Sequence, residues 1–247
     1  MRTLAIRDGD DYVLNGSKRY ITNAGKASLF TVMARTSPDT KGGSGVSAFL
    51  VPSGLPGLSV SKPEKKMGQQ GAHIHDVTFD NVRVPAWNRL GEEGEGFKVA
   101  MQVLDRGRLH IAAVCVGVAE RLIKDCVAYA GERKQFGQAI FEFPRVANKL
   151  AMMAAEIMGI RQLTYYAAAQ KDEDKRCDIE AGMAKLIAAR VAWAAADNAL
   201  QIHGGNGFAM EYGISRVLAD ARILNIFEGA GEIQAQVIAR RLLDGGN

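Results

Sequence analysis

The fold is decided by residues 91–131, GEEGEGFKVAMQVLDRGRLHIAAVCVGVAERLIKDCVAYAG, where the period of the hydrophobic pattern changes. The segment opens with the glycine- and glutamate-rich stretch 91–96, which is typical of a linker. From Phe97 to Tyr129 apolar residues recur every three to four positions, the period of an amphipathic helix, and Gly131 supplies a stop. The sequence therefore predicts a long helix that directly follows a domain boundary near residue 90.

The helical period continues to the end of the chain. Pro144 is a good first helical residue, because its fixed φ suits the first turn. Asp178 is a suitable N-cap for the helix after that. The helices expected after the first lie at residues 143–170, 178–203, 215–222 and 232–243. Long helices joined by short loops predict an antiparallel helical bundle over residues 91–247.

Residues 1–90 carry strand patterns instead. Asn15-Gly16 lies between two stretches with strand-like composition and predicts a hairpin turn, because both residues tolerate positive φ. Four further short apolar runs are bounded by Gly, Pro, Ser or Asp, at residues 29–34, 46–51, 58–60 and 74–79. This pattern predicts a small antiparallel β-barrel or sandwich. The fold class is therefore α+β, a small β domain followed by a helical bundle.

Composition excludes several classes of protein. Hydrophobic residues make up 47% and charged residues 23%, which excludes a disordered chain. The net charge is +4 with the basic residues dispersed, so we expect no nucleic-acid partner. No apolar run is long enough to cross a bilayer, and the first residues are no targeting sequence. Three cysteines without metal-type spacing predict a reducing compartment, the cytoplasm or, in a eukaryote, the mitochondrial matrix.

Glu228 is a candidate general base. It follows the apolar run 223–227 and precedes Gly229 and Gly231. Apolar surroundings would raise the pKa of its carboxyl toward that of a useful base, and the glycines would let a ligand approach the backbone. An acidic residue placed near a helix N-terminus, where the helix dipole favours it, explains the same pattern.

Two other clusters allow a functional and a structural interpretation. Asp105 and Arg108 interrupt an apolar helix, and they form either part of a site or an i,i+3 ion pair. Residues 201–208, QIHGGNGF, follow a long helix, and exposed amides beside glycines could meet a phosphate. A helix C-cap followed by a tight turn is the structural interpretation, and that stretch taken alone favours it.

Residues 133–137, RKQFG, place an arginine near Phe136, as an anionic planar cofactor would require. A solvated turn between two helices is the structural alternative. His73 and His75 lie two residues apart with no third ligand in view, so we expect no metal site.

Together and in this order, these stretches resemble the acyl-CoA dehydrogenase family of flavoproteins. Each motif alone is weak, whereas the ordered set covers essentially the whole chain. The resemblance is carried by residues 12–24 (YVLNGSKRYITNA), 66–68 (KMG), 79–85 (FDNVRVP), 94–97 (GEGF), 133–137 (RKQFG), 201–207 (QIHGGNG) and 227–229 (FEG).

The resemblance implies that FAD is held between the β domain and the bundle. The residues that match Tyr20 and Thr22 lie against the isoalloxazine ring in the family, with the threonine near N5. Other matching residues contact FAD from a neighbouring subunit, which implies a homodimer or homotetramer: Arg133, Gln135, Phe136, Gln201 and Gly205.

The resemblance also implies the activity, α,β-dehydrogenation of an acyl-CoA thioester to the trans-2-enoyl-CoA. Electrons would then pass to an electron-transfer flavoprotein. Glu228 matches the catalytic base of most branches, whereas Gly107 stands where other branches place their base. The substrate positions of the family match Asp105, Arg108 and Gly229.

Three departures from the family pattern are visible. Phe227 stands where many members have tyrosine, and Ala230 replaces a hydroxyl residue. Members normally begin with a helical domain of roughly 100–150 residues, which we expect to be absent here. An acyl-CoA oxidase that uses oxygen, and a catalytically impaired remnant that binds flavin or a partner, are the alternative functions.

Overall fold

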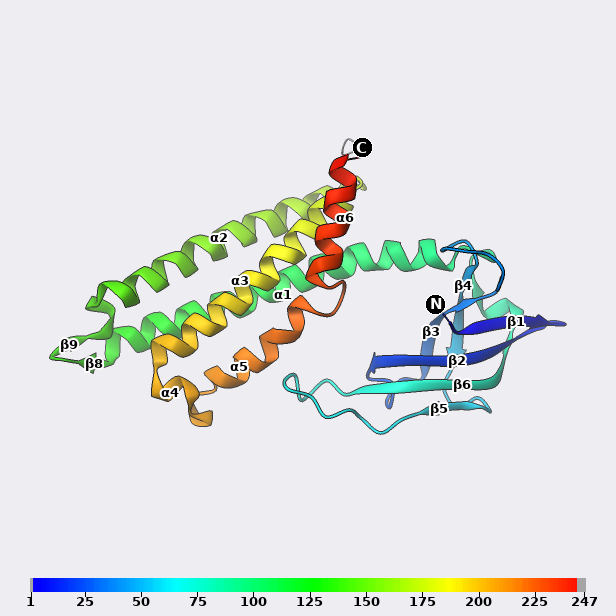
Figure 1. Cartoon of the computed structure of the whole chain (residues 1–247), viewed down its shortest axis with the longest axis horizontal. Coiled ribbons are helices and arrows are strands. Elements are labelled where there is room, and N and C mark those ends of the chain that lie inside the picture. The colour runs from blue at the N-terminus through cyan, green and yellow to red at the C-terminus, as the bar shows by residue number, and fades with distance from the viewer. Residues whose placement is uncertain (1, 244–247) are drawn as a thin grey trace. The chain divides into compact units, whose positions relative to one another are not determined.

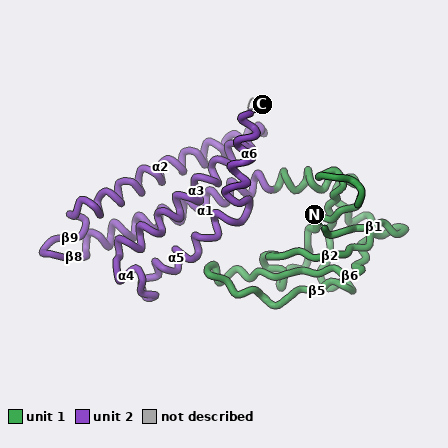
Figure 2. The backbone as a smooth tube through the Cα atoms, viewed as in Figure 1, with its two compact units in different colours: residues 1–103 green, residues 104–247 purple. Residues whose placement is uncertain are grey.

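The structure is a computed structural model that describes residues 2–243. It divides into two compact units, one ending at Val103 and one starting at Leu104 (Figure 2). The division lies inside the long helix α1, Gly96–Glu132. The boundary expected at residue 90 falls at the end of strand β7, Arg89–Leu90, before this helix.

Unit 1 is built around one seven-stranded sheet with the order β5-β6-β2-β1-β3-β4-β7. Its strands are antiparallel except for the parallel pairing of β1 with β3. The Tyr12 ring of β2 contacts the Phe49 ring of β4, with 4.9 Å between centroids, although two strands separate them in the sheet. The sheet therefore folds over its own core. The strands are β1 Leu4–Asp8, β2 Asp11–Thr22, β3 Leu29–Arg35, β4 Val46–Pro52, β5 Leu58–Val60, β6 Ile74–Pro85 and β7 Arg89–Leu90.

The prediction of a hairpin turn at Asn15-Gly16 is wrong. Both residues lie inside β2, and the tight turn before β2 is at residues 9–10. The pairing of β2 with β6 shifts register at this point, and the Asn15 side chain accepts a 2.9 Å hydrogen bond from the Asn81 backbone N–H. A Cβ at Gly16 would lie 2.8 Å from the Thr3 Cα. Glycine is needed here for a bulge and a close approach of backbone, rather than for a turn.

Unit 2 is a bundle of long helices (Figure 1). Its core is rich in alanine, above all on α3, so helix axes can approach closely. The predicted α+β class is confirmed, and the expected helices are present with ends shifted by a few residues. After α1 the elements are β8 Lys134–Gln135, β9 Gln138–Ala139, η2 Ile140–Glu142, α2 Pro144–Asp172, α3 Asp178–His203, α4 Gly205–Phe208, η3 Met210–Tyr212, α5 Ile214–Ala221, η4 Arg222–Asn225 and α6 Gly231–Leu243.

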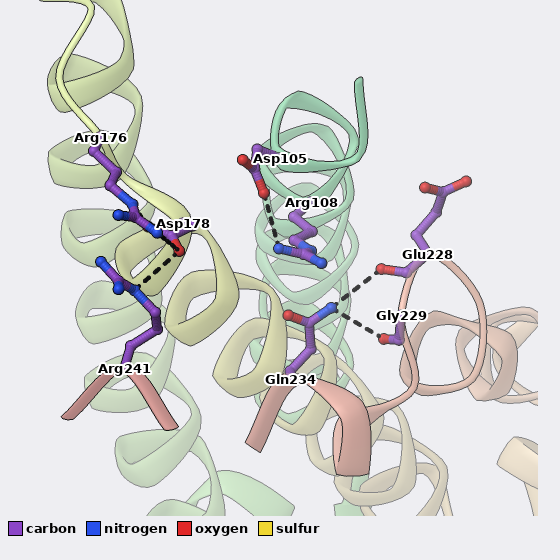
Figure 3. Close-up of polar contacts among 8 residues, drawn as sticks. All are labelled: Asp105, Arg108, Arg176, Asp178, Glu228, Gly229, Gln234 and Arg241. Atoms are coloured by element: carbon purple, nitrogen blue, oxygen red, sulfur yellow. Dashed lines mark hydrogen bonds and ion pairs between the residues drawn. The ribbon is translucent and has the colours of Figure 1, made fainter. Parts of the chain in front are cut away.

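Asp178 is not the N-cap that the sequence suggested. The N-cap of α3 is Cys177, which makes no side-chain capping bond. Asp178 lies in the first turn, where its carboxylate pairs with Arg176 at 3.0 Å and with Arg241 of α6 at 3.3 Å (Figure 3). The carboxylate is still favoured by the helix dipole, and its partners tie the far end of α6 to the start of α3.

The three cysteines are free and buried. Burial raises the pKa of Cys115 and of Cys126 to about 12, so both thiols stay protonated and pack as small apolar groups. Over residues 2–243, none of the helices is both long enough and apolar enough to span a membrane.

Candidate active site

Glu228 lies in the short loop between η4 and α6. Its backbone is in the left-handed region at φ +53°, and Gly229 follows at φ +90°. Such a conformation costs a non-glycine residue about 1–3 kcal/mol, and it persists only where the surrounding structure holds it. Glycine is required at 229, because the Nε2 of Gln234 occupies the place of a Cβ.

Two buried polar side chains hold this loop from inside the bundle. Lys185 of α3 donates a hydrogen bond from Nζ to the Gly229 carbonyl at 2.7 Å. Gln234 of α6 donates from Nε2 to the Glu228 carbonyl at 3.3 Å (Figure 3). Both side chains are fully buried. The strained backbone of Glu228 is therefore fixed by groups that belong to the same unit.

The sequence analysis missed Lys185 and Gln234. A signal for Lys185 exists, because it shares a helical face with Ala181, Ala184 and Ala188, which are all buried. A lysine on the apolar face of a helix is either buried with a partner or part of a functional site. Gln234 carries no comparable pattern.

The Glu228 carboxylate lies against α1. A Cβ added at Gly107 would be 3.1 Å from Glu228 Oε2, so the missing side chain leaves the room that the carboxylate uses. Phe227 packs against the bundle core, whereas the side chain of Glu228 is exposed. The expectation that apolar residues enclose Glu228 is therefore wrong within unit 2. The side chain of Phe227 points into the core, whereas that of the next residue, Glu228, points away from it.

Asp105 and Arg108 form the i,i+3 ion pair that was the structural alternative, with 2.9 Å between Oδ1 and Nη1. Burial raises the pKa of Asp105, and the charge of Arg108 opposes that rise. Arg108 is buried, and its Nε has no hydrogen-bond partner among the residues described. The pair lies within one helical turn of Gly107, and Figure 3 draws it together with the Glu228 loop. We call this group of residues the base end of unit 2.

The hairpin β8–β9 presents Phe136 at its tip. Phe136 and Gly137 form the two-residue turn, both at positive φ, as the tight turn of such a hairpin requires. The Phe136 side chain is 95% exposed, and Arg133 and Gln135 beside it are exposed as well. An exposed ring and an exposed guanidinium are groups that can stack against a planar anionic ligand.

Gln201 lies in the last turn of α3, and Gly205 is the first residue of α4. Both are exposed, and a Cβ built at Gly205 would meet nothing within 4 Å. Tyr129 joins the two segments: its hydroxyl accepts a 2.9 Å hydrogen bond from Asn206, and its carbonyl accepts one from the Arg133 N–H. The sequence analysis missed Tyr129 and Asn206. We call this second group the hairpin end.

The base end and the hairpin end are far apart in one chain. Gly107 and Tyr129 mark them on α1, and they are 22 residues apart. At ~1.5 Å per residue the separation along the helix is about 33 Å. Residues of both ends therefore cannot contact one isoalloxazine ring within a single chain.

Tyr20 and Thr22 lie in unit 1, near the end of β2. Tyr20 sits at an irregularity of the strand with φ +56°, and its side chain is 61% exposed. The Arg19 guanidinium lies 4.8 Å from the centre of its ring. Thr22 is also exposed.

These side chains fit FAD chemically. A flavin dinucleotide offers aromatic rings and a diphosphate, and the chain offers exposed rings at Tyr20 and Phe136 and a guanidinium at Arg133. Gln201 adds an exposed amide, and Gly205 adds unobstructed backbone. Residues 2–243 hold no cluster of His, Cys, Asp and Glu suited to a metal ion.

Two family models match the chain. The acyl-CoA dehydrogenase middle domain matches residues 1–82, and the acyl-CoA dehydrogenase C-terminal domain matches residues 94–243. The chain belongs to the acyl-CoA dehydrogenase family. The resemblance read from the ordered motifs is thereby confirmed.

The (2S)-methylsuccinyl-CoA dehydrogenase of Cereibacter sphaeroides is 56% identical over 99% of this chain and 46% of its own length. The structure of butyryl-CoA dehydrogenase from Megasphaera elsdenii matches with a TM-score of 0.95 and 42% identity, over 98% of this chain and 63% of that one. The structure of PigA with FAD and proline matches with a TM-score of 0.96 and 33% identity, over 98% and 63%. The chain thus spans about half to two thirds of these relatives.

Proposed function

We propose that this chain is the base-carrying and flavin-binding part of an FAD-dependent acyl-CoA dehydrogenase. The reaction is the α,β-dehydrogenation of an acyl-CoA thioester to the trans-2-enoyl-CoA. The observation that carries the proposal is the Glu228 carboxylate, placed over Gly107 by a loop that Lys185 and Gln234 fix from inside. Family membership supports the same chemistry.

Glu228 acts as the general base and takes the α-proton at its carboxylate. That proton is too weak an acid for a carboxylate unless the developing charge on the thioester oxygen is stabilised. The backbone N–H of Glu228 has no acceptor among the described residues and is available for this role. A bound FAD would supply the hydride acceptor for the β-hydrogen. Because Gly107 has no side chain, α1 offers no second base at this position.

Asp105, Arg108 and the backbone of Gly229 are proposed to lie beside the acyl-CoA. The buried Nε of Arg108, without a hydrogen-bond partner among the described residues, supports a role in binding, because an unpaired buried donor is costly. The ion pair with Asp105 holds the guanidinium in place while leaving this donor free.

Tyr20 and Thr22 are proposed as contacts of the isoalloxazine ring. The hairpin end is proposed to bind the FAD of a neighbouring copy, through Arg133, Gln135, Phe136, Gln201 and Gly205. The separation of about 33 Å between the two ends supports this division, and it implies a homodimer or homotetramer. We propose an electron-transfer flavoprotein as the electron acceptor, and the cytoplasm or a mitochondrial matrix as the location.

Size-exclusion chromatography with detection at the flavin absorbance tests the proposal. We expect a yellow oligomer that acyl-CoA bleaches without oxygen. A colourless monomer that FAD cannot reconstitute would contradict the proposal. Equal turnover with oxygen and with an electron-transfer flavoprotein would instead indicate an oxidase.

A further inference from the structure

Lys185 is the most unusual charged residue of unit 2. It lies on α3 with no exposed surface, although lysines are almost never fully buried unless they are paired. Burial lowers its pKa from the ordinary value. Its recorded hydrogen bond within the described residues goes from Nζ to the Gly229 carbonyl at 2.7 Å.

Among the described residues of the helix bundle, no counterion explains this burial. Cys115 lies nearby, but its thiol is protonated because burial raises its pKa to about 12. The carboxylates that act on Lys185 electrostatically are Glu228 and Glu232, at the loop and in the first turn of α6. The described residues show no Lys185 ion pair within 4 Å of a carboxylate. The lysine therefore faces the loop. Its burial costs desolvation free energy that no structural ion pair offsets.

We propose that Lys185 is a positioning residue for Glu228. Its Nζ holds the Gly229 carbonyl, Gln234 holds the Glu228 carbonyl, and the two bonds together fix the left-handed backbone that places the carboxylate over Gly107. This inference rests on the proposed role of Glu228 as the base.

The bonds matter because two consecutive residues have positive φ. Glu228 at +53° pays for that conformation, and without a donor for the Gly229 carbonyl the loop can relax to other conformations. A shift of about 1 Å in a reacting group can lower a rate by ~10²-fold. A methionine at 185 keeps the volume and the apolar packing but provides no donor.

Hydrogen exchange of the full chain tests the clamp without using activity. The amides of Ile233 and Gln234 donate to the Ala230 carbonyl at 2.9 and 3.0 Å, so their protection reports on the loop. We expect Lys185→Met to raise exchange in peptides covering residues 228–234 by about 10-fold or more. Lys149→Met is the matched control, because Lys149 is also hydrogen-bonded, to Asn198, but links α2 with α3 away from the loop.

The flavin-reduction rate provides the second readout. We expect Lys185→Met to lower that rate by about 10²-fold, with the KM for acyl-CoA unchanged and with a melting temperature no lower than that of Lys149→Met. Gln234→Met serves as the second variant if Lys185→Met does not fold, and it should change exchange and rate in the same direction.

Unchanged exchange at residues 228–234, or a flavin-reduction rate within twofold of wild type, would overturn the inference. A loss of rate that only accompanies a loss of stability would overturn it too, because a merely structural lysine gives that result. If the wild-type chain itself does not reduce flavin with acyl-CoA, the proposed function fails, and the exchange experiment alone then decides whether Lys185 holds the loop.

Discussion

The two ends of unit 2 are built in opposite ways. At the base end, Glu228 is held by Lys185 and Gln234, which are fully buried side chains of the same unit. At the hairpin end, Phe136 and Gln201 are exposed. The loop of Glu228 is supported by buried side chains of its own unit, whereas the side chains named at the hairpin end are exposed.

The roles that we propose for the two ends account for this difference. A general base must be held within a fraction of an ångström, so its loop is fixed by buried hydrogen bonds. A large cofactor is bound by exposed aromatic and cationic groups. These groups are solvated before binding, so they add little desolvation cost to the free protein. Changes at the base end should therefore lower rates, and changes at the hairpin end should lower FAD affinity.

The largest effect is expected for Glu228→Gln. The amide keeps the shape of the side chain but cannot accept the proton at neutral pH, so flavin reduction should fall by about 10²–10⁴-fold. Stopped-flow absorbance without oxygen measures this rate, and FAD content should not change. Glu156→Gln on the exposed face of α2 is the control. A variant that bleaches as fast as wild type would show that the base is another residue.

Gly107→Ala separates stability from activity. Alanine in a helix interior should stabilise the protein by about 0.5–1 kcal/mol. Its Cβ would lie 3.1 Å from Glu228 Oε2, so the carboxylate must move and flavin reduction should fall about 10-fold. Gly117→Ala on the same helix meets nothing within 4 Å. Gly117→Ala should therefore raise the free energy of unfolding, measured in urea, by the same amount without slowing flavin reduction. Equal flavin-reduction rates for the two variants would contradict the placement of Glu228.

Phe136→Ala should weaken FAD without weakening the fold. The ring is 95% exposed, so the free energy of unfolding should change by less than about 0.5 kcal/mol. One lost aromatic contact should raise the Kd for FAD by about 3–10-fold, measured by fluorescence titration of the apoprotein. Trp87→Ala, an exposed aromatic of unit 1, is the control. An unchanged Kd would remove Phe136 from the cofactor contacts.

The smallest effect is a pH dependence of stability at Lys185. Because burial lowers the pKa of this lysine, the unfolded chain holds its proton at pH values where the folded chain has released it. The stability of wild type relative to Lys185→Met should therefore rise as the pH increases toward 10.5. Urea unfolding of both proteins between pH 7 and 10.5 measures the difference. A difference that stays constant would mean that Lys185 is not desolvated.

Local patterns predicted the helices because their causes are local. Pro144 begins α2, and the three-to-four residue spacing from Phe97 onward marks α1. The same reasoning failed at Asn15-Gly16, where the composition of a turn instead serves a bulge whose partner, Asn81, lies far along the chain. Local sequence does not say which distant strand will pair with a segment.

The sequence motifs pointed to the exposed residues of the candidate site but not to the buried residues that support its loop. Glu228 and Phe136 stand in recognisable motifs, and the structure places both in loops. Lys185 reaches the loop from 44 residues away in sequence, and Gln234 acts through a side-chain amide on backbone carbonyls. Such contacts depend on how α3 and α6 pack, which no pattern within either helix specifies.

The central claim is that the base end and the hairpin end of one chain serve different flavins, and mixed oligomers test it most directly. Chains carrying Glu228→Gln are co-expressed with chains carrying Arg133→Ala and Phe136→Ala, and the doubly tagged oligomer mixture is assayed for acyl-CoA-dependent flavin reduction. In a twofold dimer, one site of each mixed pair receives an intact Glu228 and an intact hairpin. We predict recovery to about half of the wild-type rate, because oligomers that carry both tags hold one intact site of every two. A mixture no more active than the average of the two separate variants would contradict the claim.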